Sequence, residues 1–100
     1  MPDRNTLPPR RYLFPLGQVL ATPGAAALLE RTGGNAFEFL ERHQCGDWGS
    51  VPAEEVEENQ FALDAGDRIL SSYFLNETER LWIITEADRL STTLLLLDEY

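Results

Sequence analysis

The C-terminal third of the chain, from residue 68 onward, consists of three extended apolar runs separated by short polar connections. The runs read "RILSSYFL", "RLWIIT" and "TTLLLL", and the connections between them are "NETE" and "EADRLS". Runs rich in Ile, Leu, Tyr, Phe, Trp and Thr are typical of β-strands, and such short connections favour antiparallel neighbours. We therefore expect a three-stranded antiparallel meander, which constrains the fold more than any other feature.

The first ordered element is expected to be an irregular strand in "RYLFPLGQVLA". Pro15 and Gly17 interrupt this apolar run, and proline removes a hydrogen-bond donor, so the strand should lie at an edge. Its backbone groups, around Leu16 to Ala21, should pair with the meander, because unpaired buried backbone groups are unfavourable.

Two helices are predicted next. Thr22 can cap the first helix, with Pro23 at its first position, and Gly33 can end it. Asn35 begins the second, with Glu38 as a capping-box partner. The apolar face of this second helix comprises Ala36, Phe39, Leu40 and His43.

A third helix is predicted over "PAEEVEENQFALDA", with Ser50 as its cap and Gly66 at its end. Val56, Gln60 and Leu63 are expected along one side. Four glutamates occupy its first turns, where negative charge suits the helix dipole.

The order of elements predicts an α+β fold, with an N-terminal strand, about three helices and a C-terminal antiparallel meander. Helices should pack on one face of an antiparallel sheet. The 100 residues fit one domain. We expect a flexible tail of proline and arginine over 1–11 and a single α+β domain over 12–100.

The charge is strongly acidic. Seventeen acidic residues face eight basic ones, all arginine, which gives a formal net charge of −9. Such a surface repels nucleic-acid phosphates and acidic membranes, so we expect no direct binding of either and no tight binding of DNA or RNA at physiological salt. It could attract a basic protein partner, although an acidic surface also serves solubility alone.

Cys45 is the only cysteine, and it cannot form an internal disulfide. This favours a reducing, cytoplasmic location. The N-terminus lacks the apolar core of a secretory signal, and no stretch reaches the roughly 18 apolar residues of a membrane span.

His43, Cys45 and Asp47 form a local trio that invites a catalytic interpretation. Catalytic groups usually meet from distant segments, however, and His43 lies on an apolar helix face near a helix end. The structural interpretation is therefore preferred. One histidine and one cysteine do not supply four zinc ligands, so neither a metal nor another cofactor is predicted.

The "GDWG" segment, residues 46–49, places an aspartate and a tryptophan between two glycines. Asp47 could accept backbone amides and hold the loop closed. Trp48 could fill an apolar gap or serve as an exposed binding anchor. We predict the first, because leaving an indole in water is costly.

The "TEADR" segment, residues 85–89, connects two strands without glycine or asparagine. It could be a solvated charged turn or a polar cluster that grips a ligand. We predict a short helical turn in which Asp88 accepts backbone amides. The Arg89 side chain should reach backbone carbonyls or a carboxylate of the helical layer, and Asp47 is the carboxylate we expect it to contact. Arg68 and Arg80 lie just ahead of neighbouring strands, and one of them, depending on the strand register, could join Arg89.

The segments "GDWG", "RILSSY" and "WIITEADRLSTTLLLLDEY" resemble a small bacterial family described as plasmid-related proteins. The similarity extends from "LFPLGQVLATPGA" to the C-terminus, with Leu90 and Leu97 where the family has Ser and Pro. The resemblance implies a mobile-element context and no known activity. It marks as motif positions Gly46, Asp47, Trp48, Glu86, Asp88 and Arg89.

Three functions stay open. The preferred one is a non-catalytic interaction domain that binds a basic nucleic-acid-binding or defence protein. A second is a small nuclease or toxin-type enzyme of the barnase or RelE kind, which would need His43 or Glu86 as base and Arg89 and Arg68 as phosphate clamp. A third is an antitoxin-like or accessory subunit.

Overall fold

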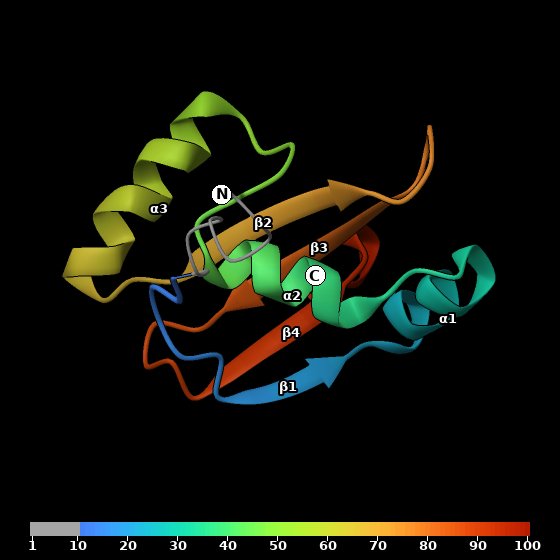
Figure 1. Cartoon of the computed structure of the whole chain (residues 1–100), viewed down its shortest axis with the longest axis horizontal. Coiled ribbons are helices and arrows are strands. Elements are labelled where there is room, and N and C mark those ends of the chain that lie inside the picture. The colour runs from blue at the N-terminus through green and yellow to red at the C-terminus, as the bar shows by residue number, and fades with distance from the viewer. Residues whose placement is uncertain (1–10) are drawn as a thin grey trace, which may run out of the picture.

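We describe residues 11–100 of the chain from a computed structural model, which has three helices and one four-stranded sheet (Figure 1). The α+β class is confirmed. The predicted flexible tail over 1–11 lies outside the described residues, apart from Arg11. The elements in chain order are β1 (Gln18–Ala21), α1 (Pro23–Thr32), α2 (Ala36–Gln44), α3 (Ala53–Ala65), β2 (Ile69–Phe74), β3 (Arg80–Thr85), β4 (Ser91–Leu95) and a 3-10 helix, η2 (Leu97–Glu99).

The strands are ordered β1-β4-β3-β2 across the sheet. As predicted, β2, β3 and β4 form an antiparallel meander, and β1 joins the same sheet at an edge. The expectation of a wholly antiparallel sheet is wrong, because β1 runs parallel to β4. The three helices return the chain to the end of the sheet where β1 began, and two hairpins then bring β4 into the direction of β1.

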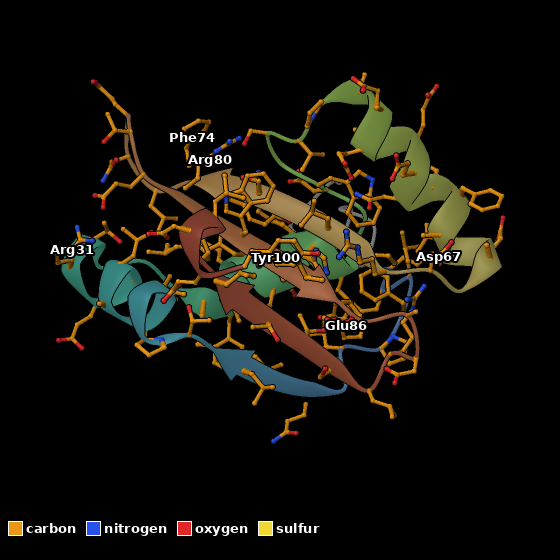
Figure 2. The ribbon with its side chains drawn as sticks, turned by 180° about the vertical axis from the view of Figure 1, so that it is seen from behind. Arg31, Asp67, Phe74, Arg80, Glu86 and Tyr100 are labelled. Carbon is orange, nitrogen blue, oxygen red and sulfur yellow. The ribbon has the colours of Figure 1, made fainter. Side chains whose placement is uncertain are left out.

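One face of the sheet carries α2, which Figure 1 shows lying across the strands. Leu40 of α2 packs in a cluster with Tyr73, Leu81 and Leu94, all buried. Figure 2, seen from behind, shows the C-terminal η2 segment over the other face. Helix α3 departs from the expected layer, because it flanks the outer edge of β2, where the Asn59 side chain bonds to the backbone of Leu70.

The predicted starts of α1 and α2 are confirmed. The Thr22 hydroxyl accepts from the Ala25 amide, and α1 ends at Gly33 with a φ of 68°. The Asn35 side chain accepts from the Phe37 amide. Glu38 donates its backbone amide to the Asn35 carbonyl, and no side-chain bond completes the predicted capping box within the described residues.

The predicted cap of α3 is wrong, and of the predicted apolar side only Leu63 packs against the buried core. Pro52 precedes the helix without a side-chain cap, and Ser50 bonds instead to the Ser72 carbonyl oxygen. The buried positions of α3 are Asn59 and Ala62. Val56 and Gln60 are exposed. The helix meets the strand edge through the polar side chain of Asn59, so apolar spacing alone identified only part of its inner face.

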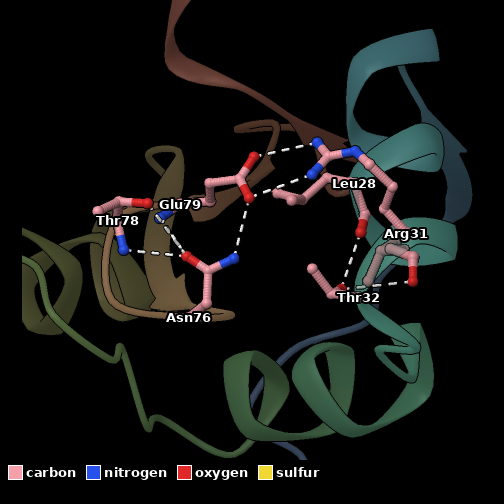
Figure 3. Close-up of polar contacts among 7 residues, drawn as sticks. Leu28, Arg31, Thr32, Asn76, Thr78 and Glu79 are labelled. Carbon is pink, nitrogen blue, oxygen red and sulfur yellow. Dashed lines mark hydrogen bonds and ion pairs between the residues drawn. The ribbon is translucent and has the colours of Figure 1, made fainter.

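At the other end of the sheet, α1 contacts the β2–β3 turn (Figure 3). Both terminal nitrogens of Arg31 donate to the Glu79 carboxylate, at 3.1 and 3.0 Å. The Asn76 side-chain oxygen accepts the backbone amides of Thr78 and Glu79, which shapes the turn. Because the ion pair is exposed, it contributes little stability.

Candidate functional site

His43 is fully buried at the interface between α2 and the sheet. Its Nδ1 lies 2.5 Å from the Ser71 hydroxyl, and its Nε2 lies 2.9 Å from the Thr85 hydroxyl. Thr85 and Thr92 hydroxyls are 2.8 Å apart, and the Thr92 hydroxyl donates to the Leu16 carbonyl at 2.7 Å. This chain of polar contacts runs from β2 through β3 and β4 to the segment before β1.

The direction of each bond in this chain follows from proton counting. Thr92 has one hydroxyl proton and gives it to Leu16, so Thr92 must accept from Thr85. Thr85 has then used its own proton and must accept from Nε2–H of His43. The Nδ1 atom is left as an acceptor for the Ser71 hydroxyl. Each hydroxyl proton has an acceptor when the histidine is neutral.

The environment of His43 holds it in that neutral form. Burial, followed by the positive charge of Arg89, lowers the pKa of His43 to about 3. The rings of Phe14 and Trp48 meet the imidazole edge-on, with centroids 5.2 and 6.0 Å away. An imidazole enclosed in this way cannot reach a substrate, so the geometry favours the structural interpretation of His43.

The "GDWG" segment is a closed loop between α2 and α3. Trp48 is 4% exposed, which confirms its predicted burial. Asp47 accepts the Gly49 amide at 3.2 Å, as expected, and pairs with the Arg42 Nε at 2.7 Å. The Tyr73 hydroxyl donates to the Asp47 carbonyl at 2.5 Å. These contacts hold the loop against the sheet.

The same loop runs along the outer edge of β2. Ser72 donates its amide to the Trp48 carbonyl at 3.1 Å and accepts the Ser50 amide at 2.7 Å. Gly49, which lies between Trp48 and Ser50 in the chain, has a φ of 74°, and a Cβ atom there would overlap the Ser72 carbonyl oxygen. Only glycine fits such a close backbone approach with this positive φ.

The "TEADR" segment reverses the chain without a regular helix. The Arg89 amide donates to the Glu86 carbonyl at 2.9 Å, which closes one turn, and Arg89 has a φ of 62°. The Leu90 amide donates to the Asp88 carboxylate at 2.9 Å, so the predicted role of Asp88 is confirmed. In place of the predicted short helical turn, the segment forms one turn, closed by the Arg89–Glu86 backbone hydrogen bond.

The Arg89 side chain joins this turn to the end of α3. Its Nη1 donates to the Asp67 and Glu86 carbonyls at 2.6 and 3.0 Å, and its Nη2 donates to the Ala62 carbonyl at 3.0 Å. The predicted contact with Asp47 is wrong, because Arg42, five residues earlier, already pairs with that carboxylate. A cation at the last carbonyls of α3 also suits the helix dipole.

No one of the three cavities that we describe brings together the residues proposed for a nuclease. The Arg68 guanidinium lies over the Tyr100 ring, with 5.5 Å to its centroid, and bonds to its hydroxyl. The Arg80 guanidinium lies over the rings of Phe74 and Trp82. Glu86 is exposed, and neither the groove beside α3, the groove beside β1 nor the cavity under Tyr100 is lined by His43, Glu86 or Arg89.

Within residues 11–100, no group of three or more His, Cys, Asp or Glu side chains is arranged to hold a metal ion. None of the helices in that range has the length and apolar character needed to cross a membrane.

An open acidic groove lies between α3 and β2. It has a volume of about 570 Å³ and an apolar residue, Phe61, that is 68% exposed. Within the described chain, the four α3 glutamates lining it have no ion-pair partner. Its lining also includes Asp67 and Arg68. The glutamates are Glu54, Glu55, Glu57 and Glu58.

Two further cavities lie elsewhere. A small apolar one of about 60 Å³ sits under Tyr100, on the sheet face opposite α2. An open groove of about 450 Å³ lies between the β1 segment and α2, with Phe37 on its rim. Sequence reasoning noted the α3 glutamates but missed Phe37 and Asn59. Phe37 falls off the apolar face of α2, which was a usable signal, whereas nothing local marks Asn59.

No family model, no curated protein and no solved structure matches this chain. The resemblance to plasmid-related proteins therefore stays a prediction.

Proposed function

We propose that this chain is a small, acidic, non-catalytic interaction domain that binds a basic protein, such as a nucleic-acid-binding or defence protein, in a plasmid or other mobile element. The observation that carries the proposal is the groove beside α3. Its four glutamates lie along one helix rather than scattered over the domain, and no arginine of the described chain pairs with them.

The geometry of the groove suits a basic protein surface. Helix α3 has 13 residues, which corresponds to a length of about 20 Å. Exposed Phe61 supplies an apolar contact within the acidic surroundings, and aromatic side chains often anchor such interfaces. Uncompensated carboxylates would speed association with a cationic partner and make binding sensitive to salt.

The experiment compares two charge-matched triple variants in a pull-down from bacterial lysate at low and moderate salt. The test variant carries Glu54→Gln, Glu57→Gln and Glu58→Gln. The control carries Glu30→Gln, Glu77→Gln and Asp98→Asn, which change net charge equally at exposed sites outside the groove. We expect a basic protein to be captured by the parent and the control and lost with the test variant. Equal capture by both variants would contradict the proposal.

A further inference from the structure

The outer edge of β1 has backbone groups without a partner in the described part of the chain. Within residues 11–100, strand β1 is the last in the sheet and β4 is its only neighbour. The Gln18 amide donates to the Leu90 carbonyl and the Thr22 amide to the Leu94 carbonyl, both at 2.9 Å. Because alternate residues of a strand point their backbone groups to opposite sides, the N–H and C=O groups of Val19 and Ala21 face away from the sheet.

Nothing in residues 11–100 pairs with that edge. All four residues of β1 are exposed, and Val19 and Leu20 are each 44% exposed. An exposed edge strand is a template for pairing with another chain unless it is blocked by a bulge, a charge or a proline. The four residues "QVLA" contain no charge and no proline.

A groove lies directly beside this edge. Its apolar lining comes from Leu16, Val19 and Leu40, with Phe37, 81% exposed, on its rim. The charged residues that line it are both acidic, Glu38 and Glu41, and Glu41 accepts a bond from Tyr12 at 3.0 Å. A strand added to β1 would present every second side chain to this groove.

We propose that an extended peptide segment of a partner protein binds along β1 as a fifth strand of the sheet. Its main chain pairs with Val19 and Ala21, apolar side chains at alternate positions enter the groove, and an arginine or lysine lies beside Glu38. Main-chain pairing supplies affinity in this mode of recognition, and the groove supplies specificity. A second copy of the chain fits less well, because each copy carries a charge of −9.

This inference goes beyond the acidic groove of α3. Strands β1 and β2 are the two outer strands of the sheet, and α3 flanks β2. The two surfaces share no lining residue. Failure at one surface therefore leaves the other proposal standing.

The test starts from a displayed library of random dodecapeptides. Enriched peptides should alternate apolar and other residues and carry arginine or lysine. The tightest binder is then synthesised unmodified, with backbone N-methyl groups at even positions, and with them at odd positions. Only one set of amides faces β1, so one methylated form should lose affinity by about tenfold or more and the other should retain it. An absence of binders, or equal affinities of the two methylated forms, would overturn the proposal.

Variants of the protein locate the peptide. Phe37→Ser and Glu38→Arg should each weaken binding by about fivefold or more. The matched changes Phe74→Ser and Glu30→Arg, at exposed sites that line neither groove, should leave it unchanged. Ala21→Pro removes an outward amide and should abolish binding while the melting temperature is retained, because edge strands tolerate proline. Equal effects of test and control changes, or an unliganded dimer in sedimentation, would contradict the assigned occupant.

Discussion

Strands β2 and β1 both lie at an edge of the sheet, but the outward backbone groups of β2 are hydrogen-bonded, whereas those of β1 have no partner in the described chain. At β2, the Asn59 side chain bonds to both the amide and the carbonyl of Leu70, at 3.0 and 2.7 Å. The next outward pair, at Ser72, is bonded by residues 48–50. At β1, the outward groups of Val19 and Ala21 have no partner within the described chain.

The difference shows that edge protection here is local and specific. Closing β2 requires a buried asparagine, a glycine with positive φ and a loop held by Asp47. Among the residues that the structure describes, none of these devices occurs at β1, which lies beside an apolar groove. Because an open edge carries a risk of aggregation, the comparison favours a use for β1 as a pairing site.

The largest expected effect comes from forcing open the β2 edge with Gly49→Ala. The new methyl group would overlap the Ser72 carbonyl, and the φ of 74° is unfavourable for alanine. We expect a loss in free energy of unfolding on the order of 3 kcal/mol, measured by urea denaturation. Gly33→Ala is the matched control, with φ 68° and no atom within 4 Å. Equal losses would show that backbone strain alone, and not edge closure, accounts for the effect.

Asn59→Ala should remove the side-chain hydrogen bonds that cover the outer edge of β2. It leaves the amide and carbonyl of Leu70 without their partners, which should cost about 2 to 3 kcal/mol in free energy of unfolding. The exposed neighbour Gln60→Ala should change stability little. If both variants unfold at the same urea concentration, Asn59 does not protect this edge.

Arg89→Ala tests whether the β3–β4 turn holds α3 in place along β2. Loss of the bonds to the Ala62 and Asp67 carbonyls should lower the free energy of unfolding by about 2 kcal/mol. Arg89→Gly loses the same bonds but relieves the positive φ, so it should be less damaging than alanine by about 1 kcal/mol. An alanine variant as stable as the parent would show that the side-chain contacts contribute nothing.

A pH titration tests the polar chain that connects β2 with the segment before β1. In the unfolded state His43 takes up a proton near its ordinary pKa of 6.5, whereas burial lowers its folded pKa to about 3. The unfolded state therefore binds more protons between these values, and stability falls as the pH drops below 6.5. The slope approaches about 1.4 kcal/mol per pH unit.

His43→Gln provides the control, because it removes this titration while keeping hydrogen-bonding capacity. Between pH 7 and pH 5, urea denaturation should show a smaller loss of stability for the variant than for the parent. Identical pH dependence in the two proteins would mean that His43 titrates normally in the folded state.

The sequence predicts the meander well, because each strand is a continuous run of strand-forming residues with polar residues at both ends. The helix boundaries at Thr22, Pro23, Asn35 and Gly66 were also readable, since capping residues act locally. Burial of Trp48 followed from its chemistry alone. These features depend on neighbours a few residues away in the chain.

The remaining features depend on contacts that no local pattern specifies. The role of Asn59 requires α3 to lie beside Leu70, eleven positions later in the chain. The parallel direction of β1 depends on the end of the sheet at which β2 begins, and the three helices between β1 and β2 determine that end. Arg89 was assigned to the wrong carboxylate because Asp47 already pairs with Arg42, five residues earlier at the end of α2. The groove beside β1 was likewise unpredictable, since it forms only when α2 crosses the sheet.

Hydrogen–deuterium exchange of individual backbone amides, measured by NMR, compares the two edges most directly. The amides of Leu70 and Ser72 should exchange slowly, because Asn59 and Trp48 accept their bonds. Those of Val19 and Ala21 should exchange quickly in the protein alone and slowly once the selected dodecapeptide is bound. Slow exchange at Val19 and Ala21 without peptide, or no change on its addition, would contradict the account of one closed and one open edge.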